Sequence, residues 1–206
     1  PVNVYGAQQV HTLLNSFWGE SAPGTYAAIE FYGSDGAFSS VALDGGSHIR
    51  DYLQGDHANQ INGTTTQNVY SSGTGFHNER RVDMQTFTLP QDFLTQSLSS
   101  IRLIDNGVSW LGHYTPQEQR IYLGGLTVEN APARFLVAEP AGQRVNNDSY
   151  VLPLSDPDDV AHARQLIQQG PAAGNTIAVA QIAQGADGIN RDYLSANDTP
   201  WSWHVT

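Results

Sequence analysis

Apolar and polar residues alternate in short runs through the first 130 residues of the chain. In Thr25–Tyr32 the apolar side chains Ala27, Ile29 and Phe31 share one face, and the run ends at the turn Gly33–Gly36. Successive side chains of a strand point to opposite faces, so this period of two predicts a half-buried strand. The same reasoning predicts further strands at residues 38–43, 64–70, 81–89, 100–104 and 119–128.

Turn signals separate these strands and helical periodicity is almost absent, which predicts an antiparallel two-sheet β-sandwich over residues 1–130. Residues 7–19 are the exception, because their apolar side chains recur at helical spacing and favour a helix. These side chains are Val10, Leu13, Leu14 and Phe17.

The pattern changes after residue 130. Residues 131–148 are expected to be a linker region, and residues 149–206 a small α/β module with one clear helix. Strands are expected at 149–154 and 176–183. The fold class expected for the whole chain is therefore mainly β.

The helix of the second module has clear end signals. Asp156 suits the N-cap, Pro157 suits the first helical position, and Gly170 suits the C-terminal stop. Asp158 and Asp159 meet the positive end of the helix dipole, so capping explains these acidic residues better than a metal site does.

Composition narrows the function classes. The 206 residues carry a formal net charge of −11, and all nine basic residues are Arg. This field repels a phosphate backbone, so a nucleic-acid partner is not expected. The absence of Cys excludes disulfides, zinc-thiolate sites and thiol nucleophiles. No apolar run approaches the ~18 residues of a membrane span, and the polar, Lys-free composition favours a secreted or periplasmic protein.

Catalytic motifs are missing from the sequence. Neither His-Glu-x-x-His nor Gly-x-Ser-x-Gly occurs, and a chain without Lys has no phosphate-binding loop of the Gly-Lys type. We therefore assign no catalytic residue. An alternative is a glycan-active or peptide-bond hydrolase that uses paired carboxylates. The carboxylates considered are Glu30, Asp51, Asp83 and Asp105.

The long polar connection at residues 44–79 is the best candidate for a calcium site. Hard cations take six to eight oxygen ligands, which carboxylate-rich and amide-rich loops offer. Alternatively, these residues are turn residues bonded to their own backbone. The candidate ligands, two of them on neighbouring turns, are Asp35, Asp44, Asp51, Asp56, Asn59, Asn62 and Asp105.

Aromatic residues in the loops are candidate ligand-binding groups. Trp110 and Tyr114 lie in a polar loop, and Tyr52 and Tyr70 lie in or beside the long connection. Exposed aromatic rings stack on sugar rings or insert into lipid, although they also fold back over a core. The two indoles of the alternating string 201–204 share one face and are expected to pack in the core.

Several motifs of the first module resemble the PLAT (lipoxygenase-homology) β-sandwich in their order along the chain. The resemblance covers roughly 100 residues and implies a sandwich fold, although the insertion at 44–79 is larger than in that family. A jelly roll of the carbohydrate-binding type is the alternative. The motifs are Gly24–Ala27, Gly33–Gly36, Phe87–Pro90, Ile101–Arg102, Asp105–Gly107 and Tyr122–Val128.

The second module resembles the first half of an α/β domain found in secreted bacterial proteins and in a slime-mould calmodulin-binding protein family. The family domain continues for some fifty residues past the last motif, so the resemblance implies an incomplete module or a second chain that completes it. The motifs are Leu154–Pro157, Ala163–Arg164, Asn190–Arg191 and Trp201–His204.

These observations favour an exported, non-catalytic binding or accessory protein. Its loops at 44–79 and 105–118 would recognise a glycan, a lipid surface or a protein partner, with calcium as an organising ion. The hydrolase described above and a subunit or processed fragment of a larger assembly are the alternatives.

Overall fold

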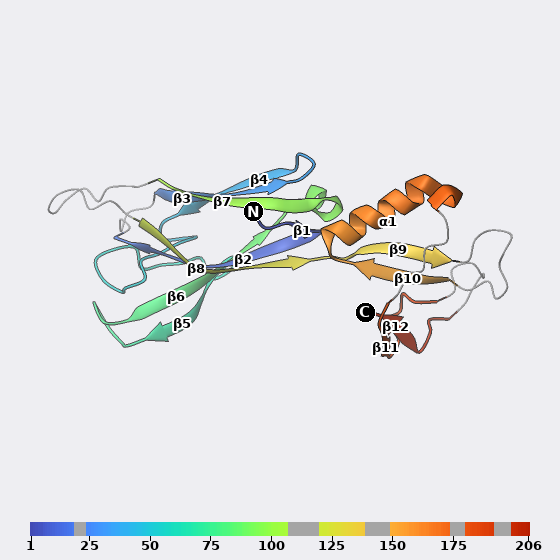
Figure 1. Ribbon diagram of the computed structural model, residues 1–206. Helices are drawn as coiled ribbons and strands as arrows, with labels where there is room; N and C mark the ends of the chain where they lie inside the picture. Colours follow the sequence, from blue (N-terminus) through green and yellow to red (C-terminus); the bar gives the residue numbers. More distant parts are fainter. Residues whose placement is uncertain (19–23, 107–119, 139–148, 174–179, 192–198) are drawn as a thin grey trace. The chain divides into compact units, whose positions relative to one another are not determined.

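A computed structural model of the chain describes residues 1–206 apart from 19–23, 107–119, 139–148, 174–179 and 192–198. The chain divides into two compact units, Pro1–Ala131 and Pro132–Thr206. Unit 1 is a sandwich of two antiparallel sheets, which form two layers in Figure 1. Unit 2 contains short strands and one α-helix. The predicted fold class, a mainly β chain with an antiparallel sandwich followed by a small α/β module, is confirmed.

Each sheet of unit 1 contains four strands. The first sheet has the order β1-β7-β3-β4, with bounds Val4–Tyr5, Ser97–Asp105, Thr25–Gly33 and Phe38–Asp44. The second has the order β5-β6-β2-β8, with bounds Thr66–Ser72, Arg80–Thr88, Ala7–Phe17 and Arg120–Asn130. A short 3-10 helix, Gln91–Thr95, precedes β7.

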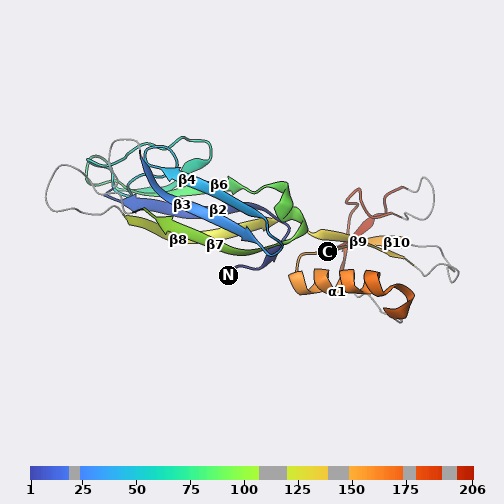
Figure 2. The same ribbon diagram turned by 90° about the horizontal axis from the view of Figure 1, so that it is seen from above.

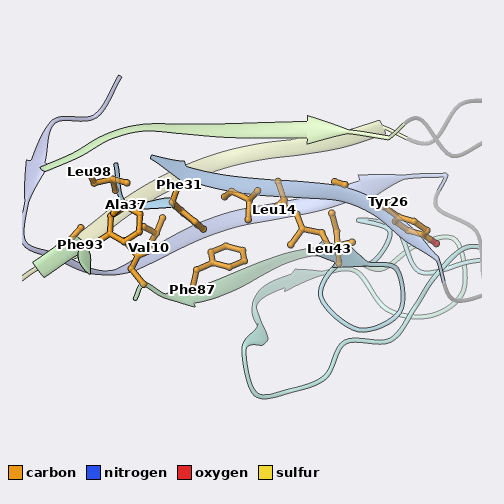
Figure 3. Close-up of a cluster of buried hydrophobic side chains, with 14 of the residues drawn as sticks. Val10, Leu14, Tyr26, Phe31, Ala37, Leu43, Phe87, Phe93 and Leu98 are labelled. Carbon is orange, nitrogen blue, oxygen red and sulfur yellow. The ribbon is translucent and has the colours of Figure 1, made fainter. Parts of the chain in front are cut away.

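The core of unit 1 lies between the two sheets (Figure 3). The predicted inward face of β3 is confirmed, because Ala27, Ile29 and Phe31 are all buried. Phe31 of the first sheet packs against Phe87 of the second, with ring centroids 5.6 Å apart. The apolar face of each strand thus meets the apolar face of the other sheet, as in other sandwiches.

The predicted helix at residues 7–19 is wrong, because Ala7–Phe17 is strand β2. Val10, Thr12 and Leu14 form its inward row and are buried. Thr12 is buried without penalty because its hydroxyl donates to Gln85 Oε1 at 2.8 Å. A polar residue in the inward row hid the period of two, and the remaining apolar positions imitated a helix.

One end of the sandwich collects most of the long connections. Strands β2 and β7 end there, and β6 and β8 begin there, as the pairing of Phe17 with Arg120 shows for β2 and β8. At this end residues 50–53 lie between β2 and β6. Ser16 N donates to Arg50 O at 2.9 Å, and Arg81 N donates to Tyr52 O at 2.7 Å. The segment therefore continues the sheet where the two strands separate.

Unit 2 is built from two strand pairs and helix α1 (Figure 2). Asp156 Oδ1 accepts from the backbone N–H groups of Asp158 and Asp159, which confirms the predicted cap. Residues 131–148, expected as a linker, include strand β9. The elements are β9 (Ala133–Ala138), β10 (Ser149–Leu154), α1 (Pro157–Gln169), a 3-10 turn (Gly170–Ala173), β11 (Ile182–Gln184) and β12 (Trp203–Val205).

The indoles of Trp201 and Trp203 stack with centroids 4.5 Å apart, so they share one face as predicted, and both are half-buried. The strand expected at 176–183 falls partly outside the described residues, and β11 covers its last part. In the described part of the chain, no helix has the length and apolarity needed to cross a bilayer.

The close approach of Gly45 to Tyr26 gives a test of the core. A Cβ built on Gly45 would lie 2.1 Å from Cζ of the buried Tyr26 ring, whereas one on Gly24 would meet nothing within 4 Å. We expect Gly45→Ala to lower the free energy of unfolding by about 1–3 kcal/mol, as overpacking does. Gly24→Ala is the matched control and should change it by less than about 1 kcal/mol. Urea denaturation of both variants measures this, and equal effects would contradict the packing described.

Candidate functional site

The outer face of the second sheet carries several apolar and aromatic side chains near the loop end, together with Gln67, which pairs with Met84, and Arg120, which pairs with Phe17. We call the apolar and aromatic part the aromatic face. It comprises Leu13 and Phe17 of β2, Tyr52 of the inserted segment, Tyr70 of β5, Val82 and Met84 of β6, and Tyr122 of β8. An outward sheet face in contact with water is normally polar, so a surface of this kind is a candidate for a binding site.

Strand register places these side chains together. Phe87, Gln85 and Asp83 alternate as buried inward residues of β6, so Val82 and Met84 point outward. Met84 pairs with Leu13 across the sheet. On the other side of β6, Tyr70 pairs with Val82. Directly paired residues share a face, so the surface crosses the whole sheet.

Ring contacts fix the centre of the aromatic face. The Phe17 centroid lies 4.5 Å from that of Tyr52 and 6.3 Å from that of Tyr122, in tilted and edge-to-face arrangements. Aromatic pairs favour these geometries. Tyr122 and Tyr70 remain 56% and 60% exposed, so their rings are available to a ligand.

Two consecutive glycines leave part of the aromatic face without side chains. Gly124 and Gly125 both lie opposite Leu13, where β8 carries one extra residue and forms a bulge. A Cβ at Gly125 would lie 3.4 Å from Leu13 Cδ1, and one at Gly124 would lie 3.6 Å from the Tyr122 ring. The missing side chains leave the flank of Tyr122 open.

Trp18 adds a further exposed ring at the end of β2. Its backbone is in the left-handed region with φ of 51°, which is uncommon for a residue with a large side chain. Its N–H donates to Asp51 Oδ2 at 2.6 Å, and its side chain is 44% exposed. A strained conformation held by a buried carboxylate is typical of functional sites.

A buried ion pair supports the inserted segment from inside the sandwich. Arg50 donates from Nε and Nη2 to the two carboxylate oxygens of Asp83, each at 2.7 Å. Asn15 Nδ2 donates to Asp83 Oδ2 at 2.9 Å, and Asn68 Nδ2 donates to Oδ1 at 3.1 Å. Asp83 is fully buried, and each of its oxygens accepts two hydrogen bonds. A buried carboxylate is stable only with partners of this quality.

A second buried arginine ties the same segment to β6. Arg81 Nη2 donates to Asp51 O at 3.0 Å and to Asn59 Oδ1 at 2.8 Å. Burial lowers the pKa of Arg81, and the nearby charge of Arg50 lowers it further. Burial raises the pKa of Asp51, although the N–H groups of Leu53 and Trp18 partly oppose this by hydrogen bonding to its carboxylate.

The predicted calcium ligands are not brought into one group. Asp44 and Asp105 lie at the end of the first sheet where β3 begins, because Thr25 pairs with Asp44 and Ala27 with Asp105. Asp35 follows the opposite end of β3. Among the described residues, no three acidic or histidine side chains gather closely enough to hold a metal ion. Calcium binding stays a prediction.

The remaining candidate ligands have local partners. The carboxylate of Asp51 accepts from Trp18 and Leu53, and Asp56 Oδ2 lies 3.2 Å from His77 Nε2. The other amide and carboxylate candidates bond to nearby groups, namely Asn59 to Gly55 and His57, Asn62 to Thr64 and Thr65, Asp44 to Thr25, and Asp105 to the N–H of Ile121.

The carboxylates considered for a hydrolase do not converge. Glu30 accepts from the Tyr32 hydroxyl and lies 3.7 Å from Arg102 on the first sheet. Asp105 lies at the end of that sheet. Asp51 and Asp83 are buried beside the arginines of the second sheet, so both are used within the fold. The described geometry therefore offers no exposed acid pair from this set.

Two of the four predicted ligand-binding aromatics, Tyr52 and Tyr70, lie on the aromatic face. Trp110 and Tyr114 fall outside the described residues. Sequence reasoning missed Phe17 and Tyr122 as site residues. The available signal was their position beside a strand end and beside Gly124–Gly125, but only the pairing of β2 with β8 shows that they are neighbours.

Comparison with known proteins finds a similarity for part of the chain. Residues 131–206 match the family model of the BP-74 N-terminal domain. The matched stretch is fewer than half of the 206 residues and coincides with unit 2 apart from Ala131. No curated protein and no solved structure matches the chain. The site on unit 1 is therefore argued from its own geometry.

The buried ion pair predicts a large cost for removing one partner. We expect Asp83→Asn to lower the free energy of unfolding by about 3–5 kcal/mol, because it leaves the Arg50 charge buried without a counter-ion. The double variant Arg50→Met/Asp83→Asn should cost less than the sum of the single variants. Urea denaturation of the wild type, the two single variants and the double variant completes the double-mutant cycle. Additive changes in the free energy of unfolding would show that the two residues are not coupled.

The raised pKa of Asp51 predicts a pH dependence of stability. Between the ordinary Asp pKa of about 3.9 and the raised folded-state value, the folded state binds more protons than the unfolded state, so stability falls as pH rises. Asp51→Asn removes this dependence. The stability of wild type relative to Asp51→Asn, measured by urea denaturation, should therefore decrease as the pH rises from about 4 through the raised folded-state pKa of Asp51. Asp92→Asn, which changes an exposed carboxylate, serves as the control. A stability difference between wild type and Asp51→Asn that increases with pH would refute the assignment.

Proposed function

We propose that unit 1 is a non-catalytic glycan-binding module whose ligand lies on the aromatic face. The single observation that carries this proposal is the group of aromatic side chains on the outer face of the second sheet. Tyr52 and Tyr122 contact Phe17, and Tyr70 and Tyr122 are more than half exposed. Exposed aromatic rings can stack on the C–H faces of sugar rings. The phenol hydroxyl groups of tyrosines can still hydrogen-bond to sugar hydroxyls or water.

Charge favours a neutral glycan over an anionic membrane or polymer. The chain carries 20 acidic and nine basic residues, so it is repelled by anionic headgroups and by sulfated or phosphorylated chains. The ring-bearing side chains of the aromatic face are themselves uncharged. A neutral saccharide meets these conditions without any need for counter-charges.

Hydrogen bonds to buried groups hold part of the aromatic face in place. Arg50, Asp83 and Arg81 anchor the backbone of the segment that carries Tyr52. Preorganised rings lose little conformational entropy on binding. The Lys-free, polar composition favours an exported protein, and unit 2, with its match to the BP-74 N-terminal domain, would then be carried beside a recognition module.

A glycan array with the full chain, followed by calorimetric titration of the glycans that bind, tests this function. We expect Tyr122→Ala to weaken binding by about 2- to 12-fold, because one aromatic contact contributes about 0.5–1.5 kcal/mol. Phe38→Ala is the matched control, since Phe38 is 54% exposed but lies on β4 of the first sheet. No binding to any glycan, or equal losses in both variants, would refute the proposal.

A further inference from the structure

The side of the sandwich between β4 and β6 contains a cavity of about 230 Å³. Strand β5 begins at Thr66, opposite Gln85, so residues 86–88 of β6 have no β5 residue beside them. The cavity lies along this stretch and reaches Val41 of β4. It is lined by Val41, His48, Thr65, Thr66, Gln85, Thr86, Phe87 and Thr88.

The lining combines an apolar part with a ring of neutral polar groups. Phe87 is buried in the core and packs on Phe31, and Val41 packs against the same core. Around them lie four threonines, the Gln85 amide and the His48 ring. Hydroxyl groups both donate and accept hydrogen bonds, so Thr65, Thr86 and Thr88, which are exposed or half-buried, suit a ligand that carries hydroxyl groups.

Existing hydrogen bonds fix several of these polar groups in place. Gln85 is 1% exposed, accepts from Thr12 and donates to Leu14 O. The buried Thr66 hydroxyl donates to His48 O at 2.9 Å. His48 Nδ1 accepts from Asp44 N at 3.2 Å, which in the neutral tautomer places the ring proton on Nε2.

Charge and size restrict the ligand. None of the eight lining side chains is permanently charged, and the Asp44 carboxylate lies 3.7 Å from His48 Nδ1. An anion would enter without a counter-charge, which is costly in a partly buried site. The volume is also below the roughly 300 Å³ at which pockets for drug-sized ligands begin.

We infer that this cavity is a second binding site of unit 1, for a small neutral polyol of the size of one sugar ring. It is separate from the aromatic face, which lies on the outer surface of the second sheet, and it does not depend on the function proposed for that face. The free stretch of β6 is three residues long, and Thr86 N already donates to Thr65 O, so addition of a peptide strand is disfavoured.

Titration of the ¹⁵N-labelled full chain with glucose, galactose, mannose and glycerol, followed by NMR, tests this inference. We expect at least one of the four to produce saturable shifts of the amide signals of residues 65–66 and 85–88. Thr88→Tyr, at an exposed lining position, should abolish these shifts by filling the cavity. Val41→Phe fills it from the opposite side and should have the same effect. Retained signal dispersion confirms that each variant is folded.

Two controls separate this site from the aromatic face. Thr74→Tyr places the same ring at an exposed threonine of the β5–β6 turn that does not line the cavity, and it should leave the shifts intact. Tyr122→Ala should also leave them intact, whatever happens on the glycan array. The inference is overturned if none of the four molecules produces saturable shifts in this region, or if the shifts persist in both filled variants.

Discussion

The ion pair between Arg50 and Asp83 is the interaction on which the rest of unit 1 depends. The inward row of β6 changes from Phe87 through Gln85 to Asp83 and Arg81, so polar groups enter the space between the sheets. A carboxylate buried there costs several kcal/mol unless it is fully paired. Its guanidinium partner comes from the long connection after β4, which must therefore lie against the strand ends.

This requirement also shapes the outer surface. With Arg50 inside, the next residues continue as a strand segment between β2 and β6. Tyr52 then lies beside Phe17 on the outside of the widened sheet. The position of Tyr52 therefore follows from the buried charges, and part of a connection predicted as a polar loop continues the sheet.

Apolar–polar alternation predicted the strands in which it is regular. It failed where a contact with a residue far away in the sequence determines which side chains are buried. The alternation in Thr25–Tyr32 identified the buried face of β3, and the cap at Asp156 placed the helix. In residues 81–89 the alternation predicted the strand but not its buried face, which carries Asp83 and Gln85. Thr12 interrupts the apolar alternation of β2. The residue that makes its burial possible, Gln85, is 73 residues away, so no local pattern reveals it. Tyr52 and Tyr70 were predicted because aromatic residues in a long polar connection are often exposed. Phe17 and Tyr122 become neighbours only through the pairing of β2 with β8, which joins residues far apart in the sequence.

Single-residue irregularities decide what the aromatic face contains. Asn68 of β5 points inward to Asp83, so strict alternation would place Val69 outward and Tyr70 inward. The bulge between Asn68 and Tyr70 adds one residue, and Tyr70 pairs with the outward Val82 instead. The extra residue in β8 opposite Leu13 has the corresponding effect, because it gives the sheet two adjacent glycines beside Tyr122. The second sheet therefore holds the buried Asp83 on its inner face and exposed rings on its outer face, because both edge strands, β5 and β8, shift register near these residues.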